Sequence, residues 1–145
     1  MFRGNHPATV DAKGRLKVPA AFLDALKQFG TQVFITSLDG GSASIYPIKV
    51  WEDIESRVHG LGALHPTRRR FSRATNAYGQ QAELDAQNRL LLPQNLRTAA
   101  NLVGKVDVLG LEHCLEVWNH ATLFSQIEDE PITDEDLSYA FSKGG

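Results

Sequence analysis

The sequence predicts a mixed α/β fold, mainly β, that is built from two copies of one small unit. Residues 11–19, D-A-K-G-R-L-K-V-P, recur 74 positions later as residues 85–93, D-A-Q-N-R-L-L-L-P. Gly30 recurs at the same spacing as Gly104. A unit of roughly 45–50 residues buries too little surface to be stable alone, so the two copies should share one core or pair with another chain.

Each copy has the predicted order strand, turn, strand, helix, strand, strand. The strands of the first copy are expected at residues 8–10, 15–18, 33–35 and 44–46, and the last two of the second copy at 106–109 and 115–118. Pro19 suits the first turn of a helix because it has no amide hydrogen to leave unpaired. Phe22 and Leu26 then follow at helical spacing, as Leu96 and Ala100 do in the second copy.

The turn between the first two strands of each copy has its own signals. Gly14 supplies the positive φ that such a turn often requires, and Asn88 is the residue most able to take that place after glycine. Asp11 and Asp85 open the two turns, and such carboxylates serve either acid–base chemistry or the turn itself. Recurrence at the same position favours a structural role, in which the aspartate bonds turn amides or pairs with the nearby arginine.

A helix is expected after each unit. The apolar stripes are Trp51, Ile54 and Val58 in the first, and Leu123, Phe124 and Ile127, after the cap Asn119, in the second. A further helix is expected at residues 67–74, with Thr67 as its N-cap. We divide the chain into unit 1 at 5–54, a helical connector at 55–76, unit 2 at 77–124, and an acidic tail at 128–145. The tail is expected to be flexible and poorly ordered, with a brief helix possible from Thr133, which Asp136 follows at capping-box spacing.

Net charge hides an uneven distribution along the chain. The whole chain carries a formal charge of −2, which taken alone argues against a nucleic-acid partner. Residues 1–76 hold 11 Lys and Arg against 6 Asp and Glu, whereas residues 77–145 hold 4 against 11. Six of the 17 carboxylates lie within residues 128–136. The average is therefore a poor guide to any one surface.

Features of membrane and secreted proteins are missing from the sequence. No stretch approaches the ~20 apolar residues of a membrane helix. The opening Met1-Phe2-Arg3-Gly4-Asn5 lacks the apolar region of a signal peptide. The single Cys114 cannot form a disulfide within the chain. We expect a cytoplasmic protein with no membrane contact.

Enzyme signatures are also missing. The sequence has no nucleotide-binding G-x-x-x-x-G-K-[ST], no G-x-S-x-G and no H-E-x-x-H. His113 next to Cys114 is either a surface histidine beside a core cysteine or part of a metal site, and the five histidines do not fall at metal-ligand spacings. We expect no catalytic residue, no metal, no cofactor and no small-molecule ligand.

Nucleic-acid binding is the function that the first hairpin suggests. Arg15 and Lys17 alternate with apolar residues, so both project from one face, and Lys13 lies at the turn. A two-stranded ribbon fits the major groove, where arginine bonds guanine bidentately and lysine suits a phosphate. The alternative is a solvated hairpin whose charges protect an edge strand. The second copy keeps Arg89 but has Gln87 and Leu91 where the first has lysines, so the first hairpin is the better candidate.

A second basic run lies in the connector. Arg68, Arg69 and Arg70 are followed by Arg73 on the helix expected there. Such a run either contacts phosphates, forms salt bridges between subunits, or is a solvated face. We therefore treat Arg68, Arg69 and Arg70, with Arg89, as secondary candidates.

The combination of these motifs resembles one known family. The opening M-F-R-G, the motif D-A-K-G-R-L-K-V-P and its repeat ending in Arg89 and Pro93 are similar to the MraZ family of bacterial transcriptional regulators. The resemblance covers residues 1 to about 127. It implies two tandem swapped-hairpin units of the SpoVT–AbrB type that form β-barrels with short flanking helices.

The resemblance also implies a function. It implies a nucleoid-associated protein that forms ring-shaped homo-oligomers and binds short direct repeats of double-stranded DNA. The site is expected in the protein's own promoter, upstream of the division and cell-wall gene cluster. By position, Lys13, Arg15 and Lys17 are placed at the DNA, and Arg3 at a phosphate. Asn88 departs from the glycine usual in the family, which puts DNA contact by the second hairpin in question.

An antitoxin-like interaction module is the alternative function, because the same swapped-hairpin unit serves there. It requires a protein partner for the C-terminal segment, and the acidic, sparsely apolar residues 128–145 are compatible with one.

Overall fold

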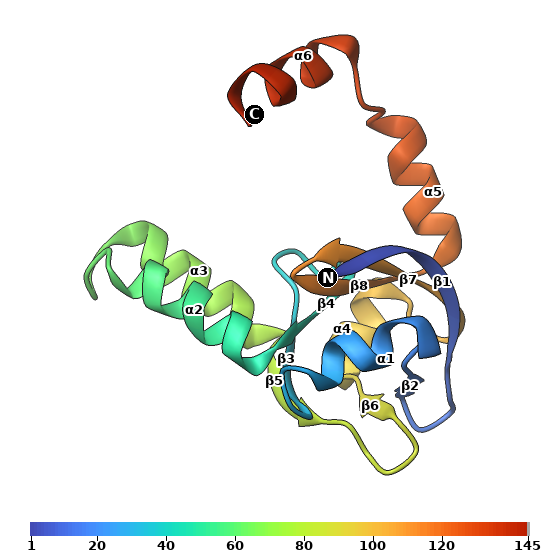
Figure 1. Ribbon diagram of the computed structural model, residues 1–145. Helices are drawn as coiled ribbons and strands as arrows, with labels where there is room; N and C mark the ends of the chain where they lie inside the picture. Colours follow the sequence, from blue (N-terminus) through green and yellow to red (C-terminus); the bar gives the residue numbers. More distant parts are fainter. Residues whose placement is uncertain (145) are drawn as a thin grey trace.

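The computed structural model describes residues 1–144, in which one antiparallel sheet curls into a barrel (Figure 1). The strands are β1 (Phe2–Val10), β2 (Arg15–Lys17), β3 (Gln32–Thr36), β4 (Ala43–Pro47), β5 (Gln80–Glu83), β6 (Arg89–Leu91), β7 (Gly104–Glu112) and β8 (Cys114–Trp118). The helices are α1 (Ala20–Lys27), α2 (Ile48–His59), α3 (Pro66–Ala77), α4 (Gln94–Ala100), α5 (His120–Asp129) and α6 (Asp134–Lys143). The predicted mixed α/β class, mainly β, is confirmed.

The two repeats interlock within this sheet. Its strand order is β5-β3-β4-β8-β7-β1-β2-β6, so the first hairpin lies between two strands of the second repeat. Strand β1 pairs with β7 along its whole length, and β2 pairs with β6. The edge strands β5 and β6 are joined by the second turn and contact each other, which nearly closes the barrel. Neither repeat could form this sheet by itself.

One hydrophobic core serves both repeats. Of the two arrangements expected from the sequence, a shared core or pairing with another chain, the structure shows the shared core. Leu16 of β2 and Leu90 of β6 lie directly opposite each other, and both are fully buried. Side chains from all parts of the barrel join them, among them Phe2, Val33, Ile45, Val108 and Leu115. Burial of one such leucine contributes about 1.5–3 kcal/mol. The core therefore holds the two hairpins together at the end of the barrel where their turns lie.

Strand β1 is longer than the sequence predicts, because it starts at Phe2 and not at residue 8. Gly4, Asn5 and Pro7 are poor strand formers, which is why the local pattern misses this part. The pairing of β1 with β7, from Phe2 opposite Glu112 to Val10 opposite Gly104, overrides those preferences.

Helices α2 and α3 form a pair that extends from the side of the barrel (Figure 1). Trp51 of α2 stacks between Phe34 of β3 and Phe71 of α3, with ring centroids 4.7 and 5.9 Å apart. The predicted N-cap of α3 is wrong. His65 is the cap, and its Nδ1 accepts a hydrogen bond from the amide of Thr67 at 3.1 Å, because Pro66 occupies the first helical position.

The C-terminal segment contains the brief helix that Thr133 and Asp136 predict. Residues 134–143 form α6, whose capping box joins Thr133 and Asp136 through two hydrogen bonds of 3.0 Å. These satisfy the amides that would otherwise destabilise the start of a short exposed helix. Helix α5 begins at the predicted cap Asn119, whose side chain accepts from the amide of Thr122. Gly145, the last residue of the predicted tail, lies outside the described residues.

Candidate nucleic-acid interface

The first basic turn is shaped by a single carboxylate. Oδ1 of Asp11 accepts hydrogen bonds from the backbone amides of Lys13 and Arg15, both at 2.9 Å. Oδ2 of Asp11 accepts from Nε of Arg15, also at 2.9 Å. The amide of Gly14 bonds the carbonyl of Asp11, and Gly14 has a φ of +85°. The D-x-x-x-R motif is thus a closed unit of turn and ion pair.

The second turn repeats this geometry. Asp85 accepts from the amides of Gln87 and Arg89 and from Nε of Arg89, each at 2.9 Å. Asn88 takes the place of Gly14 with a φ of +61°, which asparagine tolerates better than most residues. The change from glycine to asparagine therefore leaves the backbone of the second turn intact.

The turns lie side by side at one end of the barrel, because β2 and β6 form a short ribbon there (Figure 1). Arg15 lies opposite Leu91, and Lys17 lies opposite Arg89. Successive side chains on a strand point to opposite faces, so these four side chains lie on the outer face while Leu16 and Leu90 point into the core. We call these four residues the outer ribbon.

Ion pairs neutralise much of the charge at this end. Nη1 of Arg89 also lies 4.0 Å from Oδ2 of Asp11, so the carboxylates and guanidinium groups of both turns form one cluster. The backbone hydrogen bond from Arg15, followed by its side chain, holds the pKa of Asp11 below its ordinary value of 3.8, and Arg89 does the same for Asp85. Both aspartates are therefore ionised at neutral pH.

The lysines supply the remaining positive charge. Lys13 is exposed at the tip of the first turn. Nζ of Lys17 donates to the carbonyl of Gln87 at 2.6 Å, which ties the first hairpin to the second turn. An ammonium group has three donors, so this contact leaves Lys17 further donors.

Arg97 is a basic residue near the first turn that no sequence motif indicates. Its guanidinium lies against Gly14, where a side chain on that residue would collide with it, and its Nε donates to the carbonyl of Leu92 at 3.1 Å. The corresponding residue of the first repeat is Leu23, so the repeat holds no signal for a cation there. Arg97 adds positive charge behind the first turn and requires Gly14 to lack a side chain.

The other basic candidates lie elsewhere. Arg3 is exposed on β1, seven residues from Val10, which corresponds to roughly 23 Å along the strand. Arg68, Arg69 and Arg70 lie on α3, which extends away from the barrel (Figure 1), and Arg68 donates to the carbonyl of His59 at 3.2 Å. The structure therefore brings Arg89 to the first turn, but not Arg3 or the arginines of α3.

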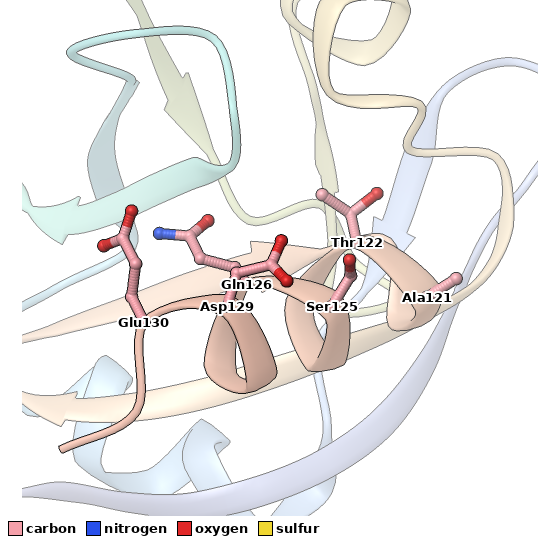
Figure 2. A pocket seen from close by; sticks show the side chains of 6 residues that line it. All are labelled: Ala121, Thr122, Ser125, Gln126, Asp129 and Glu130. Atoms are coloured by element: carbon pink, nitrogen blue, oxygen red, sulfur yellow. The ribbon is translucent and has the colours of Figure 1, made fainter.

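A pocket on α5 has the wrong chemistry for a phosphate. Figure 2 shows its lining residues along one side of that helix: Ala121, Thr122, Ser125, Gln126, Asp129 and Glu130. Two carboxylates and no cation line it, and carboxylates repel a polyanion. Within residues 1–144, no group of three or more histidine, cysteine or acidic side chains is placed to hold a metal ion. No helix of this part of the chain is long and apolar enough to cross a membrane.

Two interlocked hairpins with a basic ribbon at one end define a swapped-hairpin β-barrel protein with a candidate nucleic-acid interface. The sequence profile of the family described as "MraZ protein, putative antitoxin-like" matches residues 1–74 and 77–141. The chain belongs to the MraZ family.

Similar curated proteins carry the name transcriptional regulator MraZ. The chain is 47% identical to the one from Acidobacterium capsulatum over 137 residues, and 44% identical to the one from Koribacter versatilis over 138 residues. Each match covers 94% of this chain and 94% of the relative. A more distant relative, from Shewanella frigidimarina, is 35% identical over 89% of this chain and 86% of its own length. All three relatives are thus named as transcriptional regulators.

Proposed function

We propose that this protein is a sequence-specific regulator that binds double-stranded DNA through the outer ribbon and the first turn. The observation that carries the proposal is the convergence of two D-x-x-x-R turns on one two-stranded ribbon at the outside of the barrel. A major groove about 12 Å wide admits such a ribbon. The family membership supports the regulatory role.

Arg15 is the proposed base-contacting residue. Asp11 holds its Nε at 2.9 Å, and within residues 1–144 its two terminal nitrogens make no hydrogen bond. Those are the groups with which arginine bonds O6 and N7 of guanine. Because Asp11 already orients the guanidinium, less side-chain entropy is lost on binding.

The lysines have the role of phosphate contacts. Lys13 at the turn tip and Lys17 on the ribbon are exposed, and an ammonium group binds phosphate as a point charge. Arg3 is a further proposed phosphate contact. Arg89 and the arginines Arg68, Arg69 and Arg70 remain secondary candidates, since Arg89 is paired with both aspartates and the others lie outside the ribbon.

Assembly and target follow from the same proposal. Ring-shaped homo-oligomers would present identical ribbons at regular intervals, so weak contacts to short direct repeats would gain by effective concentration. We propose that these repeats lie in the protein's own promoter, upstream of the division and cell-wall gene cluster. The protein would then act in the cytoplasm at the nucleoid, with no reaction, cofactor or metal of its own.

Replacement of Arg15 by alanine tests the proposal. Arg15→Ala should abolish specific binding in a gel-shift titration while the mass of the oligomer stays unchanged. Arg57→Ala is the matched control, because Arg57 forms the same i, i+4 ion pair with Asp53 on α2, away from the ribbon. Equal affinity of the Arg15 variant and the wild type would overturn the site, and loss in both variants would show a nonspecific charge effect.

An antitoxin-like interaction module is the second candidate function. Helix α6 leaves Leu137, Tyr139 and Phe141 exposed beside its acidic first turn, which is the observation that favours it, and the family description includes the term antitoxin-like. Purification of the protein from its native cell would test this. A stoichiometric toxin partner lost on deletion of residues 128–145 would support it, and absence of such a partner would refute it.

A further inference from the structure

One apolar side chain lies in the middle of the basic surface. Leu91 is 48% exposed, whereas Leu16 and Leu90 on the same two strands are fully buried. A single exposed leucine is ordinary on a protein surface, so its neighbours decide what it can contact. Its neighbours on the outer ribbon are three cations: Arg15, Lys17 and Arg89.

The backbone places Leu91 beside Arg15 at close range. The two residues are cross-strand partners, and the amide of Leu92 bonds the carbonyl of Gly14 at 3.0 Å on one side of them. This position marks a non-hydrogen-bonded pair, in which the two Cα atoms lie about 4.5 Å apart and the side chains are close. The methyl groups of Leu91 are therefore within reach of a ligand that lies across the ribbon at Arg15.

Leu91 also breaks the symmetry of the ribbon. The repeat relates Arg15 to Arg89, and it relates Lys17 to Leu91. Three of the four outer positions are cations, and only the fourth is apolar. A ribbon with full twofold symmetry would favour a palindromic site. Because the two halves of this ribbon differ at Leu91, its two orientations on the DNA are not equivalent.

We propose that Leu91 contacts the C5 methyl group of a thymine in the major groove and so determines the base at one position of the DNA site. This inference rests on the proposed function. The ligand must offer an apolar group surrounded by acceptors and negative charge, and thymine is the base that presents a methyl group in that groove. Base pairs are 3.4 Å apart along each strand, so this thymine lies within about two base pairs of the base that Arg15 contacts.

The test removes only the methyl group. Sites are selected from a random pool of double-stranded DNA with the full-length protein, and each thymine of the preferred site is then replaced in turn by uracil. The wild type should bind about fourfold more weakly at one thymine, since one buried methylene-sized group contributes about 0.8 kcal/mol. Leu91→Ala should bind both forms of that site equally.

Two further variants sharpen the result. Leu38→Ala is the matched control, because Leu38 is 68% exposed in the loop after β3 and should keep the response to uracil. Leu91→Lys makes the two halves of the ribbon alike. It should lose the thymine preference and steepen the dependence of log affinity on log salt by about 0.9, if the new lysine neutralises one phosphate.

The outcomes separate the two proposals. Specific binding that no uracil weakens, or an equal loss in wild type and Leu91→Ala, overturns the role of Leu91 and leaves the proposed function standing. Failure to enrich any DNA sequence overturns both. A changed oligomer mass in Leu91→Ala would show that a second copy of the chain covers this leucine, which also overturns the proposal.

Discussion

Arg89 of the second repeat lies against Asp11 of the first, with Nη1 of the arginine 4.0 Å from Oδ2 of the aspartate. Each aspartate also holds the arginine of its own turn at 2.9 Å. The two D-x-x-x-R motifs therefore form one electrostatic cluster, although they lie 74 residues apart in the sequence.

The turns should lose stability in acid. The pKa of Asp11 and of Asp85 is lowered below 3.8, so the stabilisation is fully present above about pH 4 and is lost as pH falls through the folded-state pKa. Thermal unfolding between pH 7 and pH 3 should show a falling Tm in the wild type. Asp11→Asn with Asp85→Asn should start from a lower Tm and fall less steeply, and an equal slope in both proteins would contradict this source of the acid response.

The shared core should make the chain unfold as one unit. Leu16→Ala or Leu90→Ala should each lower the free energy of unfolding by about 2–5 kcal/mol, because each removes a fully buried side chain. The pair is in direct contact, so the double variant should deviate from additivity by about 0.5–3 kcal/mol. Urea unfolding followed by circular dichroism measures both effects, and two separate transitions would show that the repeats fold independently.

Gly14 and Asn88 should respond differently to substitution. Gly14→Ala places a side chain at a φ of +85° and against Arg97, so a loss of about 1–3 kcal/mol in the free energy of unfolding is expected. Asn88→Gly keeps the same backbone and should change stability by less than about 1 kcal/mol. Arg97→Ala should restore part of the loss in the Gly14 variant. If Arg97→Ala restored none of the lost free energy of unfolding, the whole loss would come from the positive φ at residue 14 and none from the collision with Arg97.

Trp51 should tolerate phenylalanine but not alanine. Its indole Nε1 is buried and makes no hydrogen bond within residues 1–144, and an unmet donor costs about 1–3 kcal/mol. Trp51→Phe removes that donor and retains stacking on Phe34, so its Tm should stay near that of the wild type. Trp51→Ala should lose about 3–5 kcal/mol and loosen α2 and α3. Hydrogen exchange of these helices distinguishes the two variants, and equal protection in both would refute the anchoring role.

Local features were largely predictable because short-range chemistry determines them. Gly14 and Asn88 both have the positive φ that turn chemistry requires, and Asn119 caps α5 as its position suggests. The capping box of α6 can also be found from Thr133 and Asp136, but composition favoured a flexible tail. The predicted cap of α3 was wrong because Pro66 shifts the start of that helix to His65.

Long-range pairing was not predictable from the same patterns. The first residues of β1 look unlike a strand, and only their partner β7, about 100 residues away, makes them one. The repeat does not mark Arg97 as functional, because the corresponding residue of the first repeat is Leu23. The position of Arg97 beside Gly14 depends on how α4 packs. The same holds for the outer ribbon, since β2 and β6 become neighbours only when the two hairpins interlock.

The amino-acid sequence alone reveals the duplication, because residues 11–19 and 85–93 are alike. It also predicts the shape of each turn and the alternation that puts Arg15 and Lys17 on one face, because these depend on residues within one hairpin. Which side chains share a surface depends on how the two hairpins pack together. Burying Leu16 against Leu90 brings Arg15 beside Leu91 and Arg89 beside Asp11, since a common core must form before either turn has a neighbour. The charge and the apolar contact of the proposed DNA-binding surface are products of that packing.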